Sequence, residues 1–305
     1  MSITKVVIAT RQSRLALWQA HFIQSKLRAA HPELTVELLA ITTKGDRWLS
    51  SPLAELGGKG LFIKELEQAL LEGKADLAVH SVKDVPADLP VAFSMPVIGF
   101  REDVRDTLVS ASGAGLAGLP RGARIGSSSL RRQAQLLAVR GDLNVLPIRG
   151  NVETRLKKLD DGDFDAVVLA AAGLNRLGLA RRVTEFLELD ICLPAAGQGA
   201  LGIECRAGDA EVVELLSPLQ DAKVLACVTA ERKVTQALGA DCSSPLAAHA
   251  VFSADRLTLR ALVARPDGTQ VLRAQAVGED PVSVGAEVTV SLLARGAAEL
   301  LSIGA

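Results

Sequence analysis

Short runs of apolar residues, several of them β-branched, alternate along the first third of the chain with longer segments in which apolar residues recur every three or four positions. The short runs predict strands and the longer segments predict helices, because side chains alternate along a strand and repeat about every 3.6 residues around a helix. In order, the pattern predicts a strand at residues 5–10, a helix at 14–30, a strand at 34–42, a helix at 61–73 and a strand at 75–81. This alternation is typical of βαβ units, so we predict a parallel sheet flanked by helices.

The same pattern returns after a stretch rich in glycine and proline at residues 99–123, which indicates a crossing into a second domain. Strands are predicted at 123–129, 143–150 and 165–173, with helices at 130–140 and 151–162 between them. Beyond residue 208 the order changes to a helix at 221–239, strands at 256–265 and 269–278, and a terminal helix from about 283, which predicts a small α+β domain.

A chain of 305 residues exceeds what one hydrophobic core usually holds, which supports several domains. The predicted fold class is therefore α/β, with two α/β domains around a central cleft plus a small α+β C-terminal domain. The predicted boundaries are 1–99 plus 198–218 for the first domain, 100–197 for the second and 219–305 for the third. In such folds ligands bind at the carboxyl ends of the strands.

Composition narrows the classes of partner. The 34 basic and 35 acidic residues nearly cancel, so any binding of anions must come from local clusters of positive charge. Aromatic residues make up 3% of the chain, which argues against base stacking, and we predict no nucleic-acid partner. No apolar run approaches the roughly 20 residues of a membrane span, and the first residues, MSITKVVIAT, lack the features of an export signal. We predict no membrane partner and a cytoplasmic location.

The segment GSSSLRRQ, residues 126–133, places small hydroxyl residues at the start of a helix that carries two arginines. It fits either an anion cradle, built from helix N–H groups and guanidinium donors, or an ordinary serine N-cap with a solvated arginine pair. Similar arrangements recur at 9–16, with Arg11 and Ser13, and at 148–155, with Arg149 and Arg155. The recurrence favours a polyanion as the common ligand.

The strand predicted at 75–81 is followed by Lys83 and Asp84, a step that fits either acid–base catalysis or a simple turn. We interpret His80 as a residue packed in this strand. The segment GGKGLFIKE, residues 57–65, lacks the serine or threonine of a nucleotide-binding P-loop after its lysine, and we interpret it as a glycine-hinged lid carrying Lys59.

None of the four cysteines shows C-x-x-C spacing or neighbouring histidine ligands, so we predict no metal site. We interpret Cys192, Cys205 and Cys227 as small buried hydrophobic residues. Cys242 differs, because it lies between a predicted helix end at Gly239 and a proline, where a loop can present a side chain to a ligand.

Together, the segments ATRQS, GGKGLFIKELE, AVHSVKDVP, GSSSLRRQ, RGNVETRL, LPAAGQGALGIECR and the loop cysteine followed by a proline resemble the porphobilinogen deaminase family, also called hydroxymethylbilane synthases. The matching segments occur in order and cover nearly the whole chain. The resemblance implies that the two α/β domains are similar to type II periplasmic binding proteins, and that the protein is a monomer without a metal or nucleotide.

The resemblance further implies a dipyrromethane cofactor, attached to Cys242 by a thioether, on which four porphobilinogen molecules are joined head to tail with loss of ammonia before the linear tetrapyrrole is released by hydrolysis. Asp84 would be the catalytic carboxylate, stabilising the cation left when ammonia departs. Pyrrole acetates and propionates make cofactor and growing chain a polyanion, and its carboxylates would be bound by basic and hydroxyl side chains. Implied for the cofactor are Lys83, Ser129, Arg131 and Arg132, and implied for the substrate are Arg11, Ser13, Arg149, Arg155 and Arg176, to which the lid residue Lys59 is added.

A binding module remains as the alternative, a two-domain receptor that closes on a carboxylate ligand without chemistry, because the fold alone does not fix the function. The pairing of Asp84 with a loop cysteine and the third domain argue against it.

Overall fold

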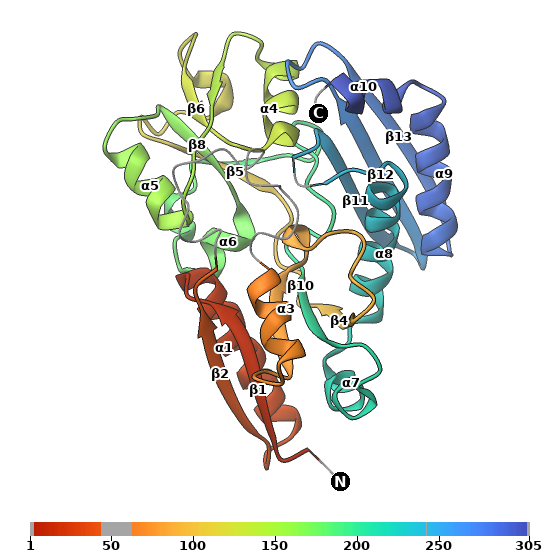
Figure 1. The fold of residues 1–305 in the computed structure, drawn as a ribbon. Helices are drawn as coiled ribbons and strands as arrows, with labels where there is room; N and C mark the ends of the chain where they lie inside the picture. Colours follow the sequence, from red (N-terminus) through yellow and green to blue (C-terminus); the bar gives the residue numbers. More distant parts are fainter. Residues whose placement is uncertain (1–2, 44–62, 242, 304–305) are drawn as a thin grey trace. The chain divides into compact units, whose positions relative to one another are not determined.

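A computed structural model describes residues 3–43, 63–241 and 243–303 of the chain (Figure 1). The chain forms two compact units, and each contains a five-stranded sheet. Unit 1 consists of Met1–Arg101 and Ala200–Leu225, and unit 2 consists of Glu102–Gly199 and Ala226–Ala305.

The sheet of unit 1 has the strand order β2-β1-β3-β10-β4. Its strands are β1 (Lys5–Arg11), β2 (Thr35–Ile41), β3 (Leu77–Ser81), β4 (Phe93–Gly99) and β10 (Leu201–Arg206). The helices of this unit are α1 (Arg14–Ala30), α3 (Lys64–Leu71) and α7 (Ala210–Leu216), with short 3₁₀ turns η2 (Val82–Asp84) and η5 (Ser217–Leu219).

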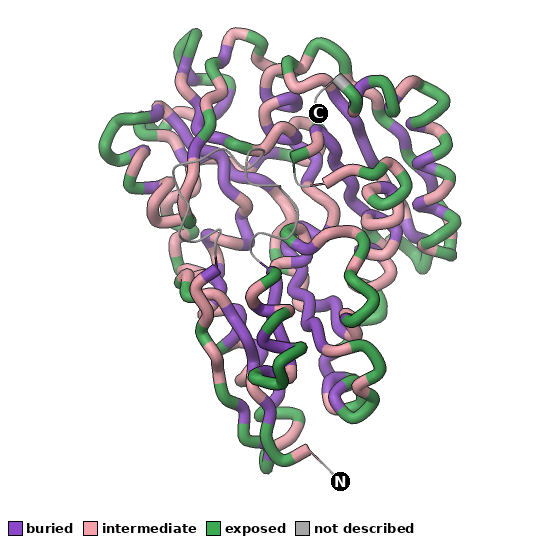
Figure 2. Tube along the Cα trace, in the orientation of Figure 1, coloured by how far each residue is buried: buried purple, intermediate pink, exposed green. Residues whose placement is uncertain are grey.

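The buried side chains of β1 show that helices cover both faces of this sheet. Val6 and Ile8 pack in one core with apolar residues of α1 and α7, whereas Ala9 packs in a second core with Leu66 and Leu70 of α3. Since successive side chains of a strand point to opposite faces, a near-continuous apolar strand is required for such two-sided burial. The purple buried segments of Figure 2 follow this strand through the unit.

The five-stranded sheet of unit 2 has the order β7-β6-β8-β5-β9. Its strands are β5 (Asp106–Ser110), β6 (Arg124–Gly126), β7 (Asn144–Leu146), β8 (Ala166–Ala170) and β9 (Glu185–Leu187). The associated helices are α4 (Leu130–Val139), α5 (Val152–Asp160) and α6 (Ala171–Arg176), with 3₁₀ turns η3 (Leu116–Gly118) and η4 (Ala180–Arg182).

The prediction of parallel sheets was wrong for one strand in the middle of each sheet. β10 runs antiparallel to both β3 and β4, and β5 runs antiparallel to both β8 and β9, so both sheets are mixed. Both antiparallel strands follow a crossing of the chain between the two units, and such a strand does not arise from a local βαβ connection. The strand predicted at 165–173 was also too long, because helix α6 begins at Ala171.

A third sheet lies in unit 2 and has the order β11-β12-β13, with all neighbours antiparallel. It consists of β11 (Leu246–Ser253), β12 (Arg256–Ala264) and β13 (Val271–Gly278), and its core is shared with α8 (Ala222–Ala237), α9 (Pro281–Leu293) and α10 (Ala297–Ile303). The matching strand orders of the two larger sheets, and this small antiparallel sheet with its helices, confirm the predicted class of two α/β folds plus a small α+β part.

The third sheet packs against helix α4, which belongs to the second sheet, within unit 2. Ala134 of α4 and Leu193 share a buried cluster with Ala247, Leu262 and Ala264 of β11 and β12. The chain thus separates into two units rather than three, and the predicted boundaries of three domains stay a prediction. No helix of the described chain is long and apolar enough to cross a membrane.

Candidate functional site

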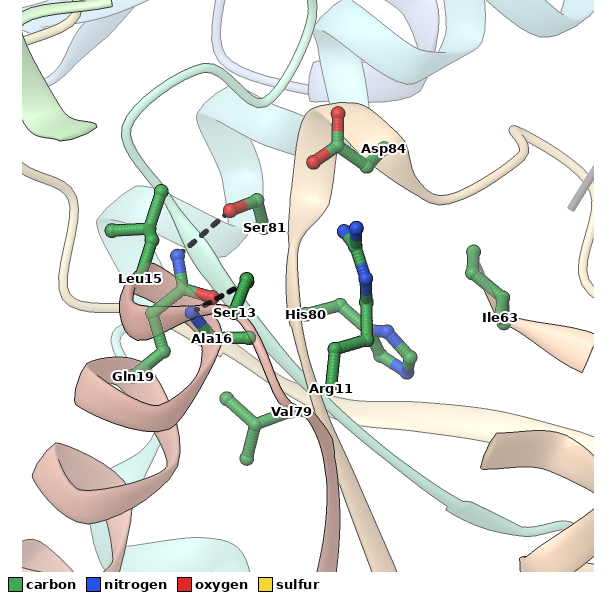
Figure 3. A pocket seen from close by; sticks show the side chains of 10 residues that line it. All are labelled: Arg11, Ser13, Leu15, Ala16, Gln19, Ile63, Val79, His80, Ser81 and Asp84. Atoms are coloured by element: carbon green, nitrogen blue, oxygen red, sulfur yellow. Dashed lines mark hydrogen bonds between the residues drawn. The ribbon is translucent and has the colours of Figure 1, made fainter. Parts of the chain in front are cut away.

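A small pocket of about 60 Å³ lies in unit 1 where β1 and β3 end beside the start of α1 (Figure 3). We call it the Asp84 pocket, and it is lined by Arg11, Ser13, Leu15, Ala16, Gln19, Ile63, Val79, His80, Ser81 and Asp84. The pocket combines the predicted catalytic carboxylate with two predicted substrate-binding residues, Arg11 and Ser13. These three side chains come from separate elements of the sheet's carboxyl edge, as the strand-end argument predicts.

Asp84 is held at the rim of this pocket by a single turn of 3₁₀ helix. The turn η2 follows β3 directly, and the backbone N–H of Val82 donates to the carbonyl of Ala200 at 3.1 Å, which ties the turn to the neighbouring β10. Asp84 itself is exposed, and its carboxylate forms no hydrogen bond with another described residue. A carboxylate that is fixed by its backbone but left without partners is suited to stabilise a developing cation.

Ser13 and Arg11 are positioned by the junction of β1 and α1. Ser13 is the N-cap of α1, and its Oγ accepts from the backbone N–H of Ala16 at 3.4 Å. Arg11 ends β1 and is half-buried, and Figure 3 shows its side chain lining the same pocket as Asp84. Lys83 is also half-buried and lies in η2, directly before Asp84.

Two polar residues of this region were missed from the sequence. Gln19 is 3% exposed, and its Nε2 donates to Ser81 Oγ at 2.8 Å across the pocket floor. Glu204 on β10 is fully buried and contacts His80 Nε2 at 2.8 Å. A glutamine on the apolar face of the helix, and a glutamate within the apolar run ALGIEC, were signals in the sequence because buried polar groups need partners.

A second group of charged side chains lies in unit 2 around the carboxylate of Asp106. Arg131 Nη1 donates to Asp106 Oδ2 at 2.7 Å, and Arg132 donates to Oδ1 through Nη2 at 2.7 Å and Nε at 3.1 Å. Gln198 Nε2 donates to Oδ1 at 3.0 Å, and the Cys192 thiol donates to Oδ2 at 3.3 Å. We call these five residues the Asp106 cluster, and all of them are buried.

The interpretation of Arg131 and Arg132 as a solvated pair was wrong, since the two residues are only 4% and 6% exposed. Further bonds fix both guanidinium groups, from Arg131 to the carbonyl of Leu193 at 2.7 Å and from Arg132 to that of Val168 at 3.0 Å. The N-cap interpretation holds for Ser129, whose Oγ accepts from the backbone N–H of Arg132 at 3.4 Å. The arginines are therefore part of the fold as well as proposed ligand-binding groups.

The Asp106 cluster has a net positive charge. Burial acts to raise the pKa of Asp106, but the charges and hydrogen bonds of Arg131 and Arg132 outweigh it and hold the pKa well below its usual range. Burial raises the pKa of the Cys192 thiol to about 12, so this thiol stays neutral. Two guanidinium groups face one carboxylate, and buried charge is costly unless it is balanced. The cluster thus carries one positive charge more than it carries negative charge.

The remaining predicted binding residues of unit 2 lie before, within or at the end of helices α5 and α6. Arg149 precedes α5 and is half-buried, and within α5 the Nε of Arg155 donates to the carbonyl of Gly150 at 2.9 Å. Arg176 closes α6, where its Nη2 donates to the carbonyl of Gly199 at 2.7 Å. Burial lowers the pKa of Arg176 to about 10, and Glu102 partly opposes the shift.

Two predicted residues, Cys242 and Lys59, lie outside the described residues. The neighbours of Cys242 lie between α8 and β11, where Ser243 donates to the carboxylate of Asp241 through its backbone N–H at 2.9 Å and through its hydroxyl. The predicted helix stop is found, because α8 ends at Ala237 and Gly239 has a φ of 61°. No group of three or more metal-ligating side chains occurs in the described ranges.

The two larger sheets carry basic and hydroxyl side chains near their strand ends. Together these features define the class of the protein, which is an α/β protein whose strand ends are suited to a carboxylate-rich ligand. Comparison with known proteins identifies the family. Residues 6–214 match the family model "Porphobilinogen deaminase, dipyromethane cofactor binding domain", and residues 225–294 match "Porphobilinogen deaminase, C-terminal domain". The chain belongs to the porphobilinogen deaminase family.

Curated relatives match over nearly the full length. The porphobilinogen deaminase of Syntrophotalea carbinolica is 52% identical over 99% of this chain and 96% of its own length. That of Thiobacillus denitrificans is 53% identical over 97% of both chains, and that of Bordetella parapertussis is 54% identical over 99% of this chain and 96% of its own. Among solved structures, the periplasmic aliphatic sulphonate binding protein SsuA of Escherichia coli is similar with 15% identity, a TM-score of 0.42 and coverage of 77% of this chain and 71% of its own. The predicted family and its dipyrromethane cofactor are confirmed.

Proposed function

We propose that the chain is a transferase that condenses four porphobilinogen molecules head to tail, releases one ammonia for each, and frees hydroxymethylbilane by hydrolysis, acting in the cytoplasm as a monomer. The observation that carries this proposal is the Asp84 pocket, in which Asp84, Arg11 and Ser13 line one cavity in a chain of this family. The dipyrromethane cofactor would supply a primer with a free pyrrole α-position, and we propose Cys242 as its point of attachment.

The proposed work of Asp84 is electrostatic. Ammonia leaves the aminomethyl group of porphobilinogen and a cationic azafulvene remains, so a nearby carboxylate lowers the barrier. Asp84 is exposed and forms no hydrogen bond with a described residue, which leaves both oxygens available to pyrrole N–H groups. Arg11 and Ser13 in the same pocket would bind carboxylates of the ring that Asp84 acts on.

The other basic residues are proposed to bind the remaining acetate and propionate groups. We assign Lys83, Ser129, Arg131 and Arg132 to the cofactor, and Arg149, Arg155, Arg176 and Lys59 to substrate. The excess positive charge of the Asp106 cluster supports Arg131 and Arg132, because a buried cation needs an anionic partner. The fixed charge of these arginines suits a ligand whose net negative charge grows with each added ring.

Intact-protein mass spectrometry tests the attachment without substrate. The wild type is expected to carry a mass excess of one dipyrromethane, and Cys242→Ser is expected to lack it. Cys227→Ser is the matched control, because Cys227 is buried in the same unit and should leave the adduct in place. An adduct that persists in Cys242→Ser would contradict the assignment, as would a wild type that stays unmodified after incubation with porphobilinogen.

A further inference from the structure

His80, which lines the Asp84 pocket, is paired with a buried glutamate, Glu204, that is not itself among the lining residues. His80 is 7% exposed and lines the pocket from β3, and Glu204 on the adjacent β10 is 0% exposed. The two side chains meet at 2.8 Å between His80 Nε2 and Glu204 Oε2. Neither residue has a role in the function proposed above.

The contact fixes the tautomer of His80. An ionised carboxylate only accepts hydrogen bonds, so the proton of the neutral imidazole is on Nε2 and the lone pair is on Nδ1. No partner of Nδ1 occurs in the part of the chain that the structure describes. The other oxygen of Glu204, Oε1, is also buried without a hydrogen-bond partner among the described residues, so the imidazole is the only group hydrogen-bonded to this carboxylate there.

The proposed reaction needs a proton acceptor besides Asp84. When the α-carbon of one pyrrole ring attacks the azafulvene, a C–C bond forms and the attacking carbon must lose its proton for the ring to regain aromaticity. Asp84 stabilises the cation only while it is ionised, so a second group that takes the proton leaves that role undisturbed. A histidine oriented by a buried carboxylate is the arrangement that proteins use for this purpose.

We propose that His80 is a further catalytic residue, whose Nδ1 accepts the α-proton during ring coupling, and that Glu204 is the positioning residue that fixes its tautomer and stabilises the imidazolium. The C–H bond breaks, its electrons return to the pyrrole ring, and the proton moves to Nδ1. The ammonia released in the same cycle then takes this proton and leaves as ammonium. The inference rests on the proposed function and deepens it.

The first test is kinetic. In His80→Gln, kcat is expected to fall about 100-fold or more, in line with the contribution of a general base, while KM changes little. With porphobilinogen deuterated at the free α-carbon, His80→Gln is expected to show a primary kinetic isotope effect that the wild type lacks, because proton removal becomes rate-limiting. A purely structural role for His80 would not produce this isotope effect.

A matched control comes from a second buried histidine–glutamate pair. His249 is 6% exposed and its Nδ1 lies 3.4 Å from Glu231, in the small sheet of unit 2. His249→Gln is expected to keep the wild-type kcat and to show no isotope effect. If His80→Gln retains both the wild-type kcat and the wild-type isotope behaviour, the inference is wrong.

The pH profile tests Glu204 separately. An amide in Glu204→Gln no longer stabilises the imidazolium, so the neutral imidazole persists to lower pH and the acid limb of kcat is expected to move to lower pH. The other charged groups facing this pair, Arg11, Asp84 and Glu67, are unchanged in this variant. An acid limb that does not move would overturn the role given to Glu204.

A third measurement does not depend on turnover. In the histidine-¹⁵N-labelled protein, the resonances absent from His80→Gln identify His80, and they are expected to show the Nε2–H tautomer in the wild type but a mixture in Glu204→Gln. A wild type with the proton on Nδ1 would refute the proposal even if the variants fold poorly. A wild type that consumes no porphobilinogen would instead refute the proposed function.

Discussion

At the scale of single residues, Asp84 differs from the other charged side chains of its unit because it is exposed at a pocket without a hydrogen-bonded partner among the described residues. Asp84→Asn is expected to lose nearly all turnover while the dipyrromethane adduct remains, since a neutral amide does not stabilise the cation. Porphobilinogen consumption and intact mass measure the two effects. Asp88→Asn, an exposed carboxylate four residues further along, is the control and should leave turnover unchanged.

We assign Asp106 a role in the stability of the fold and no role in catalysis. Asp106→Asn leaves two buried guanidinium groups without their carboxylate and is expected to lower the free energy of unfolding by about 3–5 kcal/mol. Urea unfolding measures this loss. Asp103→Asn breaks a half-buried ion pair with Arg105 and should cost about 1 kcal/mol or less. An equal cost for both variants would contradict the importance of burial.

The pH dependence of this contribution follows from the depressed pKa of Asp106. A carboxyl group whose pKa is lower in the folded state than in the unfolded state contributes stability above its unfolded pKa, and this is lost as the pH falls through the folded pKa. That folded pKa lies well below the usual range. Between neutral pH and the ordinary pKa range of aspartate, the difference in unfolding free energy between wild type and Asp106→Asn is therefore expected to stay constant, as measured by urea titrations. A decline of this difference within that pH range would refute the depressed pKa.

At the scale of elements, Glu231 connects α8 to two other segments. Its Oε2 accepts from the backbone N–H of Gly197 and its Oε1 from that of Ala250, each at 2.7 Å. Glu231→Ala would leave both buried donors unpaired and is expected to cost about 2–5 kcal/mol in urea unfolding. The exposed Glu287→Ala on α9 should change stability by about 0.5 kcal/mol or less, so a similar cost for both variants would contradict this connection.

Most helices were predictable, and so were the strands β1, β2, β3, β6, β7 and β8 of the two larger sheets, because their periodicity is local. The helix expected at 14–30 coincides with α1, and its serine cap was visible in the sequence. The strands β4, β5, β9, β10 and β11 were not predicted. For β10 and β5 the reason is that their partners lie far away along the chain and nothing local encodes an antiparallel pairing. Residue type and strand end indicated Arg11 and Ser13, and the family resemblance added Asp84, whereas Gln19 and Glu204 became visible only through their contacts.

At the scale of the whole molecule, the two sheets of unit 2 are connected where the tight turn between β12 and β13 packs against helix α4. Gly268 lies between β12 and β13 with a φ of 74°, and an added Cβ would lie 2.5 Å from the backbone nitrogen of Ala138 on α4. Neither backbone can yield easily, so Gly268→Ala is expected to separate the third sheet from α4 and lower the unfolding temperature of unit 2 in calorimetry.

Gly113 provides the matched control, because it has a φ of 76° and nothing within 4 Å of an added Cβ. Gly113→Ala therefore tests the strained φ alone, at about 1–2 kcal/mol, and the difference between the two variants measures the close packing of the sheets. Equal unfolding temperatures would show that α4 and the turn do not support one another.

The burial of Cys192, Cys205 and Cys227 has a consequence for selectivity. A methylene electrophile formed from porphobilinogen reacts with any accessible thiolate, yet these three thiols are enclosed, and burial raises the pKa of Cys192 and of Cys205. Within the described residues the fold thus works as a protecting group in the sense of organic synthesis. Unfolding should remove that protection, and a denatured chain exposed to the same electrophile should acquire several adducts instead of one.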